Sequence, residues 1–197
     1  MVSAPSGAGK TSLVRQLLAR KPQLRLSVSH TTRPRRPTEE HGREYYFVPV
    51  PQFRELLADG QFLEHAQVFD NYYGTGRGPV EAQLNEGHDV ILEIDWQGAR
   101  LVRQAMPACH SIFILPPSRQ ALEERLRNRG TDSEEVIARR LRDAVGDMSH
   151  WSEFDYVVVN DDFERALSDL SRIVDGQAGD LRATRPALEP LVADLLA

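Results

Sequence analysis

Disulfide chemistry is absent from this sequence, because Cys109 is the only cysteine among its 197 residues. Proteins without disulfides are typical of a reducing compartment, so we expect a cytoplasmic location. Long apolar runs are missing as well. Ile112–Leu115 is among the longest, and it falls far short of the roughly 20 residues that a membrane-spanning helix needs. We expect no signal peptide and no membrane partner.

An excess of basic charge is also lacking. The chain carries 24 Lys and Arg against 29 Asp and Glu, which gives a net charge of −5. Binding to the phosphate backbone of nucleic acid needs a broad basic surface, so we expect no nucleic-acid partner. A small anionic substrate is compatible with this charge, because a few local arginines are enough to bind it. The length and a hydrophobic content of 41% predict one globular domain.

What is present is a phosphate-binding loop close to the start of the sequence. Its residues are Ala4, Pro5, Ser6, Gly7, Ala8, Gly9, Lys10 and Thr11. Glycines allow successive backbone N–H groups to curl around phosphate oxygens, and Lys10 supplies a positive charge to the terminal phosphates. The hydroxyl of Thr11 can hold Mg²⁺, and the apolar-periodic helix that follows directs its positive end at the anion. Ala4 replaces the first glycine of the usual pattern, and the alternative is a chance glycine-rich turn before a helix.

Segments with strand character alternate with helical segments along the chain. The predicted strands are residues 24–29, 89–94, 111–115 and 155–159. This alternation predicts an α/β fold of three layers, in which helices cover both faces of a central parallel sheet.

Other segments depart from that alternation. Residues 29–75 are aromatic, basic and β-prone, and we expect an inserted β-rich lobe there. Residues 119–143 form two predicted helices around a glycine-containing turn, which is typical of a lid. The remaining core is expected at residues 1–28, 76–118 and 144–176. The tail at 177–197 is predicted to form a short helix against the body or against another subunit, which leaves a homo-oligomer open.

Arginines gather in two places. Arg33, Arg35 and Arg36 are followed by two tyrosines. Guanidinium groups and tyrosine hydroxyls both donate hydrogen bonds to phosphate oxygens, so we expect a second phosphate site here, for the phosphate of an acceptor substrate. Arg125 and Arg140 belong to a second set on the predicted lid, where closure would bring positive charge onto a transferring phosphoryl group. The alternative for either set is a solvated basic surface.

Carboxylates complete the pattern. Glu93 and Asp95 share one face at the carboxyl end of a predicted strand, where open α/β sheets bind ligands. Asp95 would suit Mg²⁺ or its water shell. Glu93 and Glu64 could accept hydrogen bonds from a base, and guanine offers a pair of donors that adenine lacks.

The chain resembles the guanylate kinases, a family of P-loop nucleoside monophosphate kinases, over residues 1 to about 174. The resemblance rests on the segments 27–37, 42–45, 62–64, 71–75, 92–98, 116–118, 125–140 and 159–162. It implies the P-loop kinase fold, one kinase domain over residues 1–176, and the ATP-dependent phosphorylation of GMP, and by extension dGMP, to GDP. That reaction recycles GMP in purine nucleotide metabolism and takes Mg²⁺ as cofactor, with ATP and GMP as partners.

The resemblance also implies a role for each site residue. Lys10, Arg125, Arg129 and Arg140 would act on the transferring phosphoryl group, while Asn160 would lie near the adenine. Mg²⁺ would be held at Thr11, with Asp95 acting through water. The GMP-binding residues would be Ser29, Arg33, Arg36, Tyr45, Glu64, Tyr73, Thr75, Glu93 and Asp95.

Two alternatives to this interpretation stay open. Some guanylate-kinase-like domains are catalytically inactive binding modules, although the intact Lys10 and Arg125 favour an enzyme. The other alternative is a kinase for a different phosphorylated acceptor, which Glu64 and Thr75 argue against.

The first strand is expected to be short, because only Met1, Val2 and Ser3 precede the loop. A shortened central strand loses ladder hydrogen bonds and burial, so we expect reduced stability or a start further upstream. Extending the chain by roughly five apolar residues should raise the melting temperature, and an unchanged value would contradict this expectation.

Overall fold

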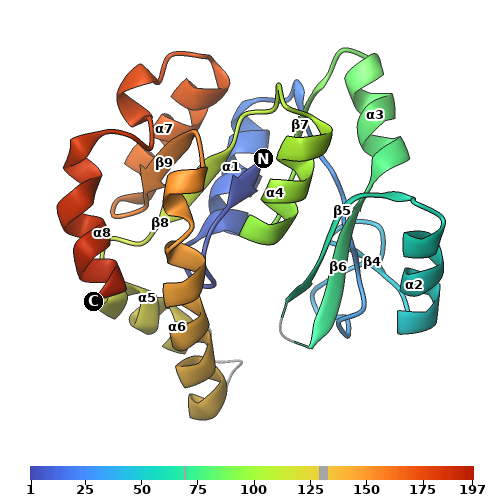
Figure 1. Cartoon of the computed structure of the whole chain (residues 1–197), viewed down its shortest axis with the longest axis horizontal. Helices are drawn as coiled ribbons and strands as arrows, with labels where there is room; N and C mark the ends of the chain where they lie inside the picture. The colour runs from blue at the N-terminus through green and yellow to red at the C-terminus, as the bar shows by residue number, and fades with distance from the viewer. Residues whose placement is uncertain (69, 129–132) are drawn as a thin grey trace. The chain divides into compact units, whose positions relative to one another are not determined.

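The computed structural model describes residues 1–68, 70–128 and 133–197 (Figure 1). The chain divides into two compact units, and each is considered by itself. The first comprises Met1 and residues 21–109, and the second comprises residues 2–20 and 110–197. Parallel strands and helices alternate along the chain, which confirms the predicted α/β class.

A parallel sheet forms the centre of the second unit. Its strands are β1 (Val2–Ser3), β8 (Ile112–Leu115) and β9 (Tyr156–Val159), in the order β1-β8-β9. β1 has the short length expected of it and pairs with Ile112 and Phe113 of β8. All four residues of β8 are buried, as the near-continuous apolar sequence of a parallel strand requires.

The second unit also contains helices and short 3₁₀ turns. The helices are α1 (Lys10–Arg20), α5 (Arg119–Arg127), α6 (Glu134–Met148), α7 (Phe163–Val174) and α8 (Glu189–Leu196), and the turns are η1 (Trp151–Glu153), η2 (Gly179–Leu181) and η3 (Pro186–Leu188). α5 begins where Ser118 caps it, since the Ser118 hydroxyl accepts a hydrogen bond of 3.0 Å from the Ala121 N–H.

The tail packs on its own unit. Leu188 and Leu195 are buried, α8 contacts α6, and the Ala183 N–H donates to the main-chain oxygen of Asp155 at 3.0 Å. The tail therefore covers apolar surface of its own chain, which is the first of the two arrangements that the sequence allowed.

The first unit contains two sheets within its described residues. β2 (Leu24–Leu26) pairs in parallel with β7 (Asp89–Ile91), while a mixed sheet has the order β4-β3-β6-β5. The strands of the mixed sheet are β3 (His30–Thr31), β4 (Tyr46–Phe47), β5 (Phe62–Val68) and β6 (Asn71–Gly76), and the helices of the unit are α2 (Val50–Ala58), α3 (Arg77–Asn85) and α4 (Trp96–Ala105). The mixed sheet thus falls in the region where the sequence predicted an inserted β-rich lobe.

The helices are too short or too polar to cross a bilayer. Over the described ranges 1–68, 70–128 and 133–197, none is both long and apolar enough to span a membrane.

Candidate active site

The phosphate-binding loop connects β1 to α1 in the second unit. Gly7 and Gly9 have φ angles of +93° and +98°, values that only glycine adopts readily. A Cβ atom at Gly7 would lie 3.0 Å from the side chains of Leu122 and Leu126, so α5 packs tightly against the loop. Lys10 begins α1, which places it and the loop N–H groups at the positive end of the helix dipole.

Asn160 lies beside this loop, directly after β9. Its side-chain Nδ2 donates to the main-chain oxygen of Ala8 at 2.7 Å. Its main-chain oxygen accepts a hydrogen bond of 2.8 Å from Nη2 of Arg125. The family resemblance implied a place near the adenine for Asn160, and the sequence did not predict these contacts with the loop and with Arg125.

The Arg125 guanidinium is only partly satisfied. Its Nη1 atom is buried and, within the described part of the chain, has no hydrogen-bond partner. A buried donor of a charged group is costly to leave unpaired. The arrangement is therefore suited to an anion that completes the hydrogen bonding of this arginine.

The other arginines of the predicted lid separate into different environments. Arg140 is half-buried on α6, which packs on α5 through a small apolar cluster that includes Leu126 and Ile137. Arg127 bridges the two helices on the surface, with ion pairs of 2.9 Å to Glu123 and to Glu134. Arg129, which the resemblance implied to be catalytic, lies outside the described residues.

In the first unit, a buried carboxylate and two hydroxyl groups form a chain of hydrogen bonds. Glu64 on β5 is 4% exposed and faces its register partner Thr75 on β6. The Thr75 hydroxyl donates to Oε1 of Glu64 and lies 3.2 Å from the Ser29 hydroxyl. The structure thus brings together three of the predicted GMP-binding residues.

The first turn of α4 approaches the same carboxylate. Asp95 caps this helix, because its Oδ1 accepts a hydrogen bond of 2.8 Å from the Gly98 N–H. A Cβ atom at Gly98 would collide with Oε2 of Glu64. Gly98 is therefore needed for the close approach of α4 to Glu64, a role that sequence reasoning missed although the glycine stands in the first turn of a predicted helix.

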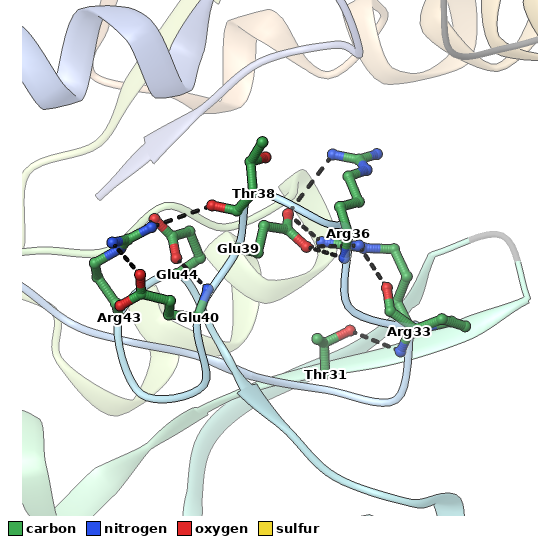
Figure 2. A network of polar contacts seen from close by, with 9 residues as sticks. Thr31, Arg33, Arg36, Thr38, Glu39, Glu40, Arg43 and Glu44 are labelled. Atoms are coloured by element: carbon green, nitrogen blue, oxygen red, sulfur yellow. Dashed lines mark hydrogen bonds and ion pairs between the residues drawn. The ribbon is translucent and has the colours of Figure 1, made fainter.

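Glu39 joins the two arginines of the predicted acceptor-phosphate site (Figure 2). Arg33 donates to Glu39 through Nη1 at 3.0 Å and through Nη2 at 2.8 Å. The main-chain N–H of Arg36 donates to the same carboxylate at 2.8 Å. Burial by itself would raise the pKa of Glu39, but these hydrogen bonds and the positive charges lower it below its ordinary value.

Glu39 was not predicted from the sequence. The available signal was its spacing, since Arg33, Arg36 and Glu39 recur every third residue along one loop. Arg35, which the sequence grouped with these arginines, is exposed.

Aromatic rings surround the Arg33 guanidinium. Its carbon Cζ lies 5.6 Å from the ring centre of Tyr45 and 5.7 Å from that of Phe47. Burial raises the pKa of Tyr45 to about 12, and the neighbouring Tyr73 and Glu93 add to the increase. The Tyr45 hydroxyl is therefore a stable hydrogen-bond donor at neutral pH. Tyr73 lies with its ring centre 5.9 Å from that of Tyr45, so the predicted phosphate ligands gather in one place.

The residues predicted to hold Mg²⁺ are Thr11, exposed in the first turn of α1, and Asp95, half-buried before α4. No group of three or more His, Cys, Asp or Glu able to hold a metal is found in residues 1–68, 70–128 and 133–197. Mg²⁺ in phosphoryl-transfer enzymes is usually held by nucleotide phosphates together with one or two protein oxygens. A hydroxyl next to a phosphate-binding loop fits that mode of binding.

Comparison with known proteins decides the family. The family model for guanylate kinase matches residues 1–177. The chain belongs to the guanylate kinase family. The resemblance seen in the sequence motifs is thereby confirmed.

Curated relatives and a solved structure agree with this assignment. The guanylate kinase of Methylococcus capsulatus is 58% identical over 196 residues, which cover 100% of this chain and 96% of the relative. That of Yersinia pestis is 52% identical over 199 residues, with coverage of 100% and 96%. A crystal structure of guanylate kinase from Anaplasma phagocytophilum superimposes with a TM-score of 0.75 and 34% identity, over 97% of this chain and 90% of that one. All three bear the name of an enzyme, which favours an active kinase over a binding module.

Proposed function

We propose that this chain transfers the terminal phosphoryl group of ATP to GMP, and also to dGMP, to form GDP or dGDP. The observation that carries the proposal is the buried Glu64 carboxylate with its hydroxyl partners Thr75 and Ser29. A fixed carboxylate accepts the N1–H and N2–H₂ donors of guanine, and adenine cannot supply that pair. Glu93 and Asp95 would complete the recognition of the base.

The acceptor phosphate would bind at Arg33, Arg36, Tyr45 and Tyr73. Two guanidinium groups match the charge of a phosphate dianion, and the tyrosine hydroxyls donate to its remaining oxygens. Because Glu39 already holds Arg33 at both terminal nitrogens, the phosphate would meet a prearranged site.

The ATP phosphates would lie in the loop formed by Ala4, Pro5, Ser6, Gly7, Ala8, Gly9, Lys10 and Thr11. Mg²⁺ would be held by the Thr11 hydroxyl and the nucleotide phosphates, with Asp95 acting through water, and would neutralise phosphate charge. Arg125, Arg129 and Arg140 would then stabilise the transferring phosphoryl group. Arginines in that role raise rates by about 10³–10⁵ in phosphoryl-transfer enzymes.

Domain roles follow from the same assignment. Residues 29–75 would form the GMP-binding lobe and residues 119–143 the lid, within a kinase domain at 1–176. Closure of a lid excludes water, which would otherwise accept the phosphoryl group. We place the reaction in the cytoplasm, in the recycling of purine nucleotides.

A coupled assay of ADP formation tests the proposal. Purified protein is given ATP and Mg²⁺ with GMP, AMP, UMP or dTMP, and we expect kcat/KM for GMP to exceed the others by at least about 100-fold. Glu64→Gln should lower kcat/KM for GMP. As a control, Arg127→Gln, which removes an exposed arginine from its surface ion pairs, should leave kcat/KM unchanged. Equal turnover of AMP would contradict the guanine assignment, and no turnover of any acceptor would favour the binding module.

A further inference from the structure

Asn160 lies among the residues of the second unit that would bind the phosphates of ATP, the phosphoryl donor. It follows β9, is 4% exposed, and is held to the sheet because its N–H donates to the Leu115 main-chain oxygen at 2.9 Å. β8 and β9 pair residue by residue from Ile112–Tyr156 to Leu115–Val159. The backbone of Asn160 is therefore fixed to two largely buried strands of its unit.

From this fixed position the side chain reaches the phosphate-binding loop. Nδ2 donates to the Ala8 main-chain oxygen at 2.7 Å, and Ala8 is fully buried. A Cβ atom at Gly9 would collide with the same Nδ2, so the loop backbone rests directly on the amide group. Asn160 thus supports the loop at two successive residues, one by a hydrogen bond and one by contact.

The main-chain oxygen of the same residue orients Arg125. It accepts a hydrogen bond of 2.8 Å from Nη2, while the buried Nη1 of that guanidinium has no partner in the described part of the chain. One residue therefore connects the loop that would bind the ATP phosphates with an arginine that would contact the transferring group.

We propose that Asn160 is a positioning residue for the donor phosphates, acting through the Ala8 carbonyl and through Arg125 and not by contact with the adenine. This inference rests on the proposed function only in assigning the loop to ATP. Its consequence is that Asn160 matters equally for every nucleoside triphosphate, because the loop contacts the phosphates and not the base.

The experiment compares how tightly Asn160→Ala and the parent chain bind three polyphosphate compounds. Removing Nδ2 leaves the buried Ala8 oxygen without its donor, so we expect binding of ATP, ITP and inorganic tripolyphosphate to weaken by a common factor of about ten. Dissociation constants for all three are measured by titration calorimetry, and kinetic constants with ATP are measured by ADP formation. KM for GMP should stay within about twofold, since the change lies on the donor side.

Two further variants keep the test decisive. Asn160→Asp has nearly the same size but places an oxygen against the Ala8 oxygen, so it should weaken tripolyphosphate binding more than Asn160→Ala. Asp161→Asn changes the next residue, which is exposed and paired with Arg165, and it should leave all three affinities unchanged. If Asn160→Ala does not fold, Asn160→Ser, which is shorter and buries no charge, answers the same question.

The outcomes separate cleanly. A loss confined to ATP, or no loss with any donor, overturns the positioning role, and the former result would assign Asn160 to the adenine. Failure of the parent chain to phosphorylate GMP would contradict the proposed function instead. The tripolyphosphate titration would still test Asn160 in that case.

Discussion

The proposed acceptor and donor regions of this chain satisfy the hydrogen bonding of their arginines in opposite ways. On the acceptor side, both terminal nitrogens of Arg33 donate to Glu39, so the protein supplies its own counter-charge. On the donor side, Arg125 bonds to a main-chain oxygen through Nη2 and has a buried Nη1 without a partner in residues 1–68, 70–128 and 133–197. The proposed acceptor site is thus held in shape by the protein itself, whereas the proposed donor site would be completed by its ligand.

This difference has a physical basis. A carboxylate that binds a guanidinium through both oxygens fixes its orientation at low entropic cost. It also neutralises part of the positive charge that would attract a phosphate. A guanidinium with an unused hydrogen-bond donor has its full positive charge available to attract a ligand, but the protein is less stable while the site is empty. Preorganisation is therefore expected to dominate GMP binding, and ligand-induced order to dominate ATP binding.

The most severe test of the donor side is Lys10→Ala. Loss of the charge at the loop should lower kcat by at least about 10³-fold, while the dissociation constant for GMP changes less than about twofold. Turnover is measured by ADP formation and GMP binding by calorimetry. Normal turnover would show that the donor phosphates bind elsewhere.

On the acceptor side, Gly98→Ala should have the next largest effect. The new methyl group would collide with Oε2 of Glu64 and displace the carboxylate, so we expect KM for GMP to rise by about tenfold or more with KM for ATP unchanged. Replacing a helical glycine favours the helix by about 1 kcal/mol, which offsets part of the cost of the collision, and a thermal melt of the variant separates lost stability from lost GMP affinity.

A matched control exists for this variant. Gly78 lies in α3 of the same unit, and a methyl group added there would have nothing within 4 Å, so Gly78→Ala should leave both KM values unchanged. The combination Gly98→Ala with Glu64→Asp, which shortens the acid, should recover part of the lost affinity. An unchanged KM in Gly98→Ala would show that Glu64 does not depend on this close approach.

Glu39→Gln tests whether the internal counter-charge positions Arg33 or merely competes with the substrate. We expect positioning to dominate, so GMP should bind about tenfold more weakly while guanosine, which lacks the phosphate, binds as before. Both dissociation constants are obtained by calorimetry. Tighter GMP binding would mean that Glu39 acts as a competitor for the arginines.

The smallest expected effect concerns pH. The pKa of Glu39 lies below its ordinary value of 4.5, so its contribution to stability is present above that value and is lost as the pH falls through the lowered, folded-state pKa. The difference in melting temperature between the parent chain and Glu39→Gln should therefore shrink as the pH falls from 7 to about 3. A constant difference would show that the ion pair does not stabilise the fold.

Much of the candidate site could be predicted from sequence because its chemistry is carried by residue types in fixed local patterns. The loop around Lys10 and the paired arginines Arg33 and Arg36 are of this kind. Glu39 and Gly98 were missed for different reasons. An acidic residue in a charged loop is usually solvated, and a helical glycine shows its purpose only when the neighbouring Glu64 is in place.

The sequence by itself determined the alternation of strands and helices, the phosphate-binding loop and the family, since each depends on periodicity or on residues close together in the chain. Only the tertiary structure decided what Asn160 contacts and where the tail packs. These outcomes depend on hydrogen bonds between residues far apart in sequence, such as the bond from Asn160 to Ala8. Local patterns contain no record of such distant partners.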